Sequence, residues 1–273
     1  MIQKLDLLQT PNGETALDSF THWARCVEVP LCDGRVVSVA QDPDSLVLGT
    51  TVWDSSKTLL KFIEQRSVRF QSFSSICELG AGCGGLAGIA SAIVTRGLAH
   101  VVLTDIGPVL PWLRRNVREN LTEKELQRLR VEQGTPAVNF HAPFDCIICA
   151  DVVYEKACVK PLMQSLLALS HRRTVIFIAN ERRALEVREE FMMYIDKYFH
   201  WKEIPKTELD ADYYKEGIEV FEMRPKKRKV PIEMQIVASE NARSDENWDN
   251  QELHNPDSWN DLMRDLSAVA NKK

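Results

Sequence analysis

The sequence contains no long apolar run, and this absence excludes one class of protein. Its longest apolar stretches, such as CIICADVV at residues 146–153, fall far short of the about 20 residues that a membrane-spanning helix needs. The N-terminal segment MIQKLDLLQT also lacks the basic and apolar blocks of a secretory signal peptide. We therefore expect a protein that neither crosses a membrane nor follows the secretory route.

A basic excess is missing as well. The 273 residues include 34 Lys or Arg and 39 Asp or Glu, for a formal net charge of −5. From residue 231 onward nine acids face four bases, so the preceding part of the chain is formally neutral. Because a neutral body lacks the broad basic surface that sequence-independent phosphate binding requires, we do not expect nucleic acid as a substrate.

The cysteines do not form an even set. Seven of them occur in a chain without a secretory signal, which predicts reduced thiols. Cys146 and Cys149 have C-x-x-C spacing, but three residues along a strand place two side chains on opposite faces. We therefore interpret this pair as core packing and expect no metal site.

The most informative segment is SSICELGAGCGG at residues 74–85, an apolar strand that leads through an acid into a glycine-rich turn. Gly80, Gly82 and Gly84 remove side-chain bulk, so the backbone can approach a ligand and the next helix presents free N–H groups. This pattern predicts a nucleoside site. Gly80, Gly82 and Gly85 also fit the G-x-G-x-x-G spacing of dinucleotide enzymes, which leaves a dehydrogenase open.

The residues after this turn complete a βαβ unit. A helix is predicted over residues 86–97, ending at Gly97, and HVVLTD at residues 100–105 is predicted to be the second strand. Asp105 ends this strand, where an acidic side chain would bind ribose hydroxyls. The alternative is an ordinary crossover in which Asp105 caps the next helix.

Other segments have the periodicity of helices and strands. Residues 26–39 predict a β-hairpin around Asp33-Gly34, placed to cap the cofactor side or to extend the domain edge. Further helices are predicted at residues 58–65, 108–120, 157–170 and 184–199, and further strands at 174–180, 200–205 and 218–223.

Two features distinguish methyl transfer from hydride transfer. Glu78 precedes the glycines, and FDCIICADVVYEKA at residues 144–157 is a buried strand that runs into Asp151-x-x-Tyr154. This pairing resembles S-adenosylmethionine-dependent methyltransferases. It is most similar to the seven-β-strand protein-lysine methyltransferases of the methyltransferase-like 21 type, whose hallmark is Asp or Glu, two residues, then Tyr or Phe. GTTVWD, LTDIGPVLPWLRRNVREN and IFIANERR also resemble this family, so that the likeness covers roughly residues 26–224.

The resemblance implies an α/β fold, with a Rossmann-like, seven-stranded, mostly parallel sheet and helices on both faces. It also implies S-adenosylmethionine as cofactor, a protein as substrate, and Asp151 and Tyr154 as catalytic residues that face the substrate amine. The residues expected at the cofactor are Trp53, Glu78, Gly80, Ala81, Gly82, Asp105 and Ala150. One position departs from the family: Gln133-Gly134 stands where a Trp-Gly pair commonly packs near the adenine.

The expected mechanism follows from charge. A lysine amine has a pKa near about 10.4 and must lose a proton before its lone pair can accept a methyl group. Asp151 could accept a hydrogen bond from this amine while Tyr154 orients it; the alternative is that Asp151 caps a helix beginning near Glu155. Two other functions stay open: methylation of a histidine, nucleic-acid base or small amine, and a non-catalytic scaffold. Val152-Val153 replaces the prolines of the Asp-Pro-Pro-Tyr motif of base methyltransferases, which disfavours a base.

Three parts of the chain are predicted: an N-terminal extension with the hairpin (1–48), the methyltransferase domain (49–224) and a tail (225–273). PKKRKV at residues 225–230 resembles a nuclear localisation signal, which predicts an importin partner and a place in both cytoplasm and nucleus; solvated surface charge is the alternative. The tail is expected to be largely disordered, with a short amphipathic helix at its end. We expect a monomer.

Overall fold

The computed structural model describes residues 23–134 and 142–226. Most of the predicted acidic tail, its terminal helix and the last four residues of PKKRKV lie outside the described residues. No helix in these two ranges is long and apolar enough to cross a membrane.

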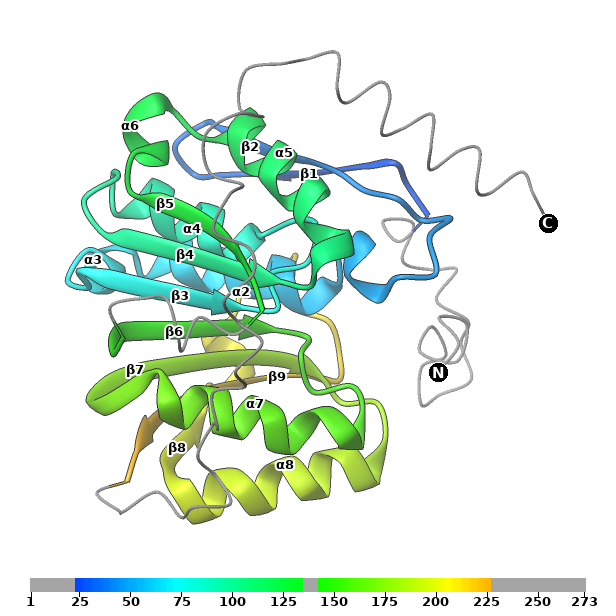
Figure 1. Cartoon of the computed structure of the whole chain (residues 1–273), viewed down its shortest axis with the longest axis vertical. Coiled ribbons are helices and arrows are strands. Elements are labelled where there is room, and N and C mark those ends of the chain that lie inside the picture. The colour runs from blue at the N-terminus through cyan, green and yellow to red at the C-terminus, as the bar shows by residue number, and fades with distance from the viewer. Residues whose placement is uncertain (1–22, 135–141, 227–273) are drawn as a thin grey trace, which may run out of the picture. The chain divides into compact units, whose positions relative to one another are not determined.

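The main sheet of the described region has seven strands, and its architecture confirms the predicted fold class. In chain order the strands are β3 (Ser75–Leu79), β4 (His100–Asp105), β5 (Leu129–Gln133), β6 (Phe144–Ala150), β7 (Ser170–Glu181), β8 (Phe199–Glu203) and β9 (Ile218–Pro225). They lie side by side in the order β5-β4-β3-β6-β7-β9-β8 (Figure 1). β9 runs antiparallel to both of its neighbours, and the other pairings are parallel.

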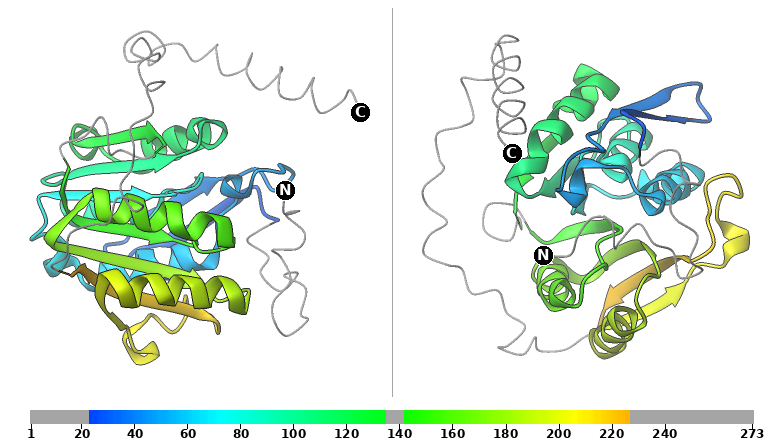
Figure 2. Two further views of the ribbon diagram at one scale, coloured as in Figure 1. Left: turned by 60° about the horizontal axis from the view of Figure 1, so that its bottom comes forward. Right: turned by 90° about the vertical axis from the view of Figure 1, so that its right-hand side faces the viewer.

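Helices cover both faces of this sheet (Figures 1 and 2). The first face packs against α2 (Asp54–Gln65), α4 (Leu86–Val94) and α5 (Leu110–Asn120). The second face packs against α7 (Lys156–Ala168) and α8 (Leu185–Tyr198). The strands are apolar on both sides because each face is buried, which is typical of parallel sheets with helical crossovers.

The cysteine pair of β6 illustrates this two-sided burial. Cys146 packs in the core beneath the first set of helices and Cys149 in the core beneath the second. Both thiols are free, and the described residues contain no cluster of His, Cys, Asp or Glu that could hold a metal ion. The interpretation of this pair as core packing on opposite faces is confirmed.

The predicted hairpin is present as β1 (Cys26–Pro30) and β2 (Val36–Ala40), but it forms its own two-stranded sheet. It therefore does not add strands to the seven-stranded sheet. It docks on α5, where Asn120 bonds both the N–H and the carbonyl of Ser38, and Asn116 does the same for Ala40. These amides satisfy one edge of β2, so the hairpin needs no strand partner there.

The structure contains elements that the sequence pattern did not predict. β5 was missed because most of its side chains are exposed or half-buried, so it shows no apolar alternation. The short helix α6 (Glu123–Leu126) begins with a capping box between Thr122 and Glu125. The remaining short elements are α3 (Ser67–Phe70), η3 (Leu48–Thr50), η4 (Gly107–Val109) and η5 (Lys206–Glu208).

Candidate active site

The carboxyl ends of the parallel strands lie along one edge of the sheet. Asp105 at the end of β4 is in register with Gln133 of β5, and Ala150 at the end of β6 with Ala179 of β7. β4 and β5 lie on one side of β3, and β6 and β7 lie on its other side. The strand order therefore reverses at β3. Ligands of such sheets bind where the strand order reverses in this way.

The glycine loop follows β3 at this point. Gly80 and Gly82 have φ values of 65° and 63°, which favour glycine, and a Cβ atom on Gly80 would lie 2.8 Å from Cγ1 of Val152. The backbone of the loop is held from two sides. Ala81 donates to the carbonyl of Thr104 (2.9 Å), and Cys83 donates to that of Gly49 (2.6 Å).

Asp105 closes one side of this loop. Its Oδ2 accepts a hydrogen bond from the Gly82 N–H (2.7 Å) and its Oδ1 one from the Ile106 N–H (2.7 Å). Burial raises the pKa of this carboxyl, while both hydrogen bonds act to lower it. The N-cap residue of η4 is Ile106, and no side chain caps this helix with a hydrogen bond. The alternative that Asp105 caps the next helix is therefore wrong.

Glu78 lies beneath the loop. Its side chain is fully buried, and its Oε2 accepts a hydrogen bond from the Gly88 N–H (2.7 Å) in the first turn of α4. Burial raises the pKa of this carboxyl to about 8. The structure therefore places Glu78 between β3 and α4, with no surface exposed toward the strand ends, although the sequence predicted it among the cofactor contacts.

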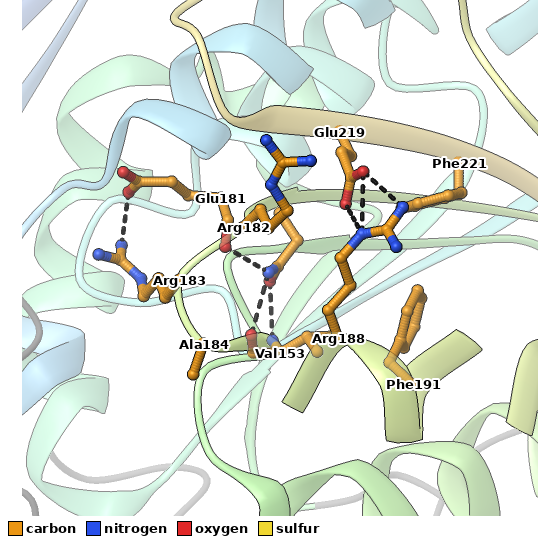
Figure 3. A pocket seen from close by; sticks show the side chains of 10 residues that line it. Val153, Glu181, Arg182, Arg183, Ala184, Arg188, Phe191, Glu219 and Phe221 are labelled. Carbon is orange, nitrogen blue, oxygen red and sulfur yellow. Dashed lines mark hydrogen bonds and ion pairs between the residues drawn. The ribbon is translucent and has the colours of Figure 1, made fainter. Parts of the chain in front are cut away.

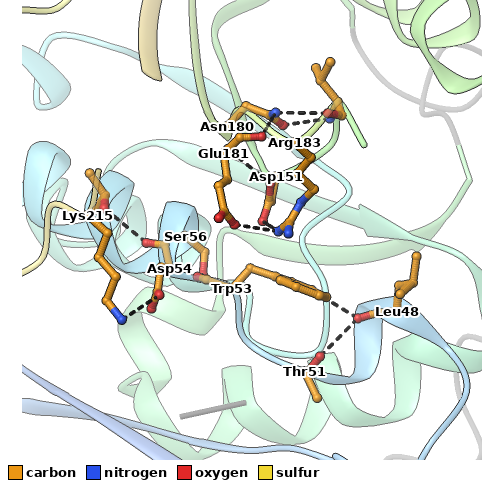
Figure 4. A network of polar contacts seen from close by, with 12 residues as sticks. Leu48, Thr51, Trp53, Asp54, Ser56, Asp151, Asn180, Glu181, Arg183 and Lys215 are labelled. Atoms are coloured by element: carbon orange, nitrogen blue, oxygen red, sulfur yellow. Dashed lines mark hydrogen bonds and ion pairs between the residues drawn. The ribbon is translucent and has the colours of Figure 1, made fainter. Parts of the chain in front are cut away.

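Trp53 precedes α2 and lies next to the loop segment of Gly49. Its indole Nε1–H donates to the carbonyl of Leu48 (3.2 Å), and the ring is half-buried (Figure 4). The guanidinium carbon of Arg183 lies 4.6 Å from the centre of this ring. Trp53 thus connects the segment before α2 to the residues that follow β7.

Asp151 is the centre of a polar network (Figure 4). It has a φ of 55°, and its N–H donates to the carbonyl of Ala179 (2.8 Å). Its Oδ2 accepts from Nη2 of Arg183 (2.9 Å) and its Oδ1 from the Glu181 N–H (3.3 Å). Burial raises the pKa of Asp151, against the opposing charge of Arg183. α7 has Glu155 as its N-cap, so the alternative that Asp151 caps this helix is wrong.

Tyr154 follows on the same loop and is half-buried. Burial, with a further contribution from Cys158, raises the pKa of its phenol to about 12. The hydroxyl is therefore neutral near pH 7, and it can both donate and accept a hydrogen bond. The charge of Asp105 contributes to the same shift, which is consistent with a position of Tyr154 near the strand ends.

Three residues of the site were not predicted from the sequence: Asn180, Glu181 and Arg183. The Asn180 amide bonds both the N–H (2.8 Å) and the carbonyl (3.0 Å) of Val153, and so fixes the loop between Asp151 and Tyr154. The available signal was the polar run NERR directly after a buried strand, since such residues lie at the same sheet edge as Asp151.

Gln133 and Gly134 lie beside Asp105. The Gly134 N–H donates to the Asp105 carbonyl (2.9 Å), and a Cβ atom on Gly107 would lie 3.5 Å from Nε2 of Gln133. Ala150, the last residue of β6, is half-buried beside Ala179.

These residues fit a nucleoside cofactor. Asp105 keeps lone pairs beyond the two that accept backbone hydrogen bonds. The Gly49 backbone approaches this carboxylate closely: a Cβ atom on Gly49 would lie 3.6 Å from Oδ1 of Asp105 and 2.8 Å from Cγ2 of Val109. A carboxylate beside bare backbone suits vicinal hydroxyl groups and an adjacent charged chain.

Comparison with known proteins agrees with this geometry. A family model described as lysine methyltransferase matches residues 32–198. Protein N-lysine methyltransferase METTL21A of Xenopus tropicalis is 33% identical over 150 residues, which are 54% of this chain and 67% of that protein. EEF1A lysine methyltransferase 3 of the same organism is 26% identical over 76% of this chain and 89% of its own length.

Among solved structures, the glycopeptide N-methyltransferase MtfA complexed with sinefungin has a TM-score of 0.47 at 12% identity, covering 60% of this chain and 93% of that one. The family match spans more than half of the chain, including the glycine loop, Asp105 and Asp151. The chain therefore belongs to the lysine methyltransferase family and is an S-adenosylmethionine-dependent protein-lysine methyltransferase.

Proposed function

We propose that methyl transfer to a protein lysine takes place at the strand ends between Asp105 and Asp151. The observation that carries this proposal is the placement of these two acids. Asp105 ends β4, Asp151 follows β6, and the glycine loop after β3 lies between them. One acid is thus available for the nucleoside and the other for the substrate amine.

The cofactor would be held by Trp53, the Gly80–Gly82 backbone, Asp105 and Ala150. When bound, it supplies a methyl group on a sulfonium centre. Asp105 would accept hydrogen bonds from ribose hydroxyls through its remaining lone pairs. Glu78 is buried and therefore would not contact the cofactor. Instead, its hydrogen bond to the Gly88 N–H in the first turn of α4 would help to position the glycine loop.

Asp151 and Tyr154 would receive the substrate amine. Asp151 accepts a hydrogen bond from the amine and orients its lone pair, and the proton passes to water. Tyr154, as a neutral phenol, positions the same group. Correct placement of two reactants supplies much of the rate in such a reaction.

A protein substrate is favoured over the other acceptors. The curated relatives are named as protein-lysine methyltransferases, and none of the names quoted above refers to a base, a histidine or a small amine. The Val152-Val153 pair points the same way, since it lacks the two prolines of the base-methylating motif.

The variant Asp151→Asn tests this assignment. It preserves the size of the side chain and removes its charge, so methyl transfer into lysate protein should fall roughly a hundredfold or more. Calorimetry should show unchanged affinity for S-adenosylhomocysteine. Asp145→Asn, at the opposite end of β6, is the matched control and should behave like wild type. Wild-type transfer by Asp151→Asn would show that this carboxylate has no part in the reaction.

We also propose that the enzyme is present in cytoplasm and nucleus and that an importin binds PKKRKV. The start of this segment is attached to the domain: Pro225 pairs with Phe199 in the sheet, and the Lys226 N–H donates to the Tyr198 carbonyl (2.8 Å). Lys226 Nζ also donates to the Asp196 carbonyl (2.5 Å). The remaining cations, at 227–229, are therefore the ones to test.

A further inference from the structure

The Arg183 side chain is ion-paired with Asp151, the carboxylate that we assign to the substrate amine. Only 4% of the Asp151 side chain is exposed, and its Oδ2 lies 2.9 Å from Nη2 of Arg183. A substrate amine cannot reach this oxygen while the guanidinium stays in place. Arg183 is itself only 12% exposed, so it is a packed component of the site.

The surroundings of the Arg183 guanidinium are those of a site for an organic cation. Its Nη2 forms a second ion pair with Oε2 of Glu181 (2.9 Å), and its carbon lies 4.6 Å from the centre of the Trp53 ring (Figure 4). Two carboxylates and the face of an indole bind an alkylammonium by the same forces that bind a guanidinium.

Arg183 is the cation paired with both Asp151 and Glu181, whereas a neighbouring acid pairs with lysines. Asp54, another carboxylate of the network, pairs with Lys57 and Lys215. In the described part of the chain, the ion pairs of Asp151 and Glu181 both go to Arg183. Removal of the guanidinium would therefore leave a buried and a partly exposed carboxylate against an aromatic face, and a substrate lysine would supply the missing charge.

Arg183 also borders a small hollow. The residues from Asn180 to Ala184 line a hollow between β7, β9 and α8 (Figure 3). Arg188 and Glu219 form a bidentate pair on its far wall, with N–O distances from 2.7 to 3.0 Å. The hollow holds little more than one water molecule, so a displaced Arg183 guanidinium has to move outward.

We propose that Trp53, Asp151 and Glu181 form the substrate's cation site and that Arg183 occupies it until a lysine ammonium takes its place. This inference rests on the role proposed above for Asp151. It assigns Glu181 to substrate binding, and it makes Arg183 a specificity-determining residue: a substrate must bring a cation strong enough to replace a guanidinium, which neutral acceptors cannot do.

Binding of n-butylammonium, the side chain of lysine without its backbone, tests the proposal. Its affinity is measured by calorimetry at pH 7 in the presence of saturating S-adenosylhomocysteine. Arg183→Ala should bind this probe at least about tenfold more tightly than wild type, because the internal competitor is gone. Arg182→Ala removes an exposed arginine one residue away and should match wild type. Neutral 1-pentanol should gain no affinity in either variant.

Two further variants complete the experiment. Arg183→Met keeps an unbranched apolar stem without the charged guanidinium and should show the same gain if the alanine variant does not fold. Adding Asp151→Asn to the Arg183 variant should abolish most of the gain, because one of the two carboxylates is lost. If the folded Arg183 variants bind n-butylammonium no better than wild type, Arg183 is a fixed clamp on Asp151 and the proposal is overturned. That result would leave the proposed function intact as long as methyl transfer still depends on Asp151.

Discussion

The Asp105 carboxylate accepts backbone hydrogen bonds from the loop on one side and from the start of η4 on the other. It therefore organises the glycine loop before any ligand arrives. The same carboxylate is the proposed partner of the ribose, so a single substitution is expected to affect both the loop and the cofactor.

Asp105→Ala should weaken S-adenosylhomocysteine binding at least about tenfold, because charge-assisted hydrogen bonds contribute roughly 1.5–3 kcal/mol. Calorimetry on the folded variant provides the measurement. Unchanged affinity would contradict the assignment of Asp105. The same titration with NAD on the wild-type protein is the control, since tighter binding of NAD would favour the dehydrogenase alternative.

Glu78 links the stability of the protein to pH. Burial raises its pKa from 4.5 to about 8, so between these values the folded state holds a proton that the unfolded state has lost. The free energy of unfolding should therefore fall as pH rises from about 5 to 8, by up to about 1.4 kcal/mol per pH unit from this group. Burial shifts the pKa of Asp105, Asp151 and Glu181 in the same direction.

Glu78→Gln imitates the protonated side chain and should reduce this loss of stability. Urea denaturation of both proteins at pH 5 and pH 8 measures it: the variant should lose less stability than wild type over this interval. Equal losses would mean that Glu78 does not hold the extra proton.

At the scale of elements, the hairpin and α5 form one support for the glycine loop. Asn116 is fully buried; its Nδ2 donates to the carbonyls of Ala40 and Cys83 (2.8 Å each), and its Oδ1 accepts from the Ala40 N–H (2.9 Å). One side chain thus connects β2 to the loop that follows β3. The hairpin is therefore more than an appendage to the domain.

Asn116→Ala should destabilise the protein by about 2–4 kcal/mol, because several buried polar groups lose their partner. It should also weaken cofactor binding, because the carbonyl of Cys83 is released. Thermal denaturation and calorimetry measure the two effects. Arg115→Ala, on the exposed side of the same helix, should change neither; a variant of Asn116 with wild-type stability would show that the hairpin docks by other contacts.

At the scale of the whole molecule, the proposed nuclear localisation signal begins at Pro225, the last residue of β9. Replacement of Lys227, Arg228 and Lys229 by alanine should move a fluorescent fusion out of the nucleus without loss of methyl transfer in vitro, because β9 and the strand ends are untouched. Substitution of the exposed Arg172 and Arg173 removes cations elsewhere and should leave the distribution unchanged. If the first variant also keeps its distribution, PKKRKV is surface charge.

Much of the fold was predictable because its signals are local. The buried strands β3, β6 and β7 are short apolar runs, and the glycine loop needs its residues in sequence order. β5 escaped prediction because its side chains are largely solvent-facing and only pairing with β4 makes it a strand. The position of the hairpin was equally hidden, since it depends on amides of a helix 76 and 82 residues further along the chain.

The sequence by itself determined the glycine loop, the acid at the end of β4 and the Asp-x-x-Tyr motif after β6, because spacing along one strand and one turn decides which residues reach the sheet edge. Only the tertiary structure decided which side chains and backbone groups these residues contact. It buried Glu78 under α4, and it placed Arg183, 32 residues after Asp151, between two carboxylates and the Trp53 ring. Such contacts join strand ends that are neighbours in the sheet and distant in the chain, so no local pattern encodes them.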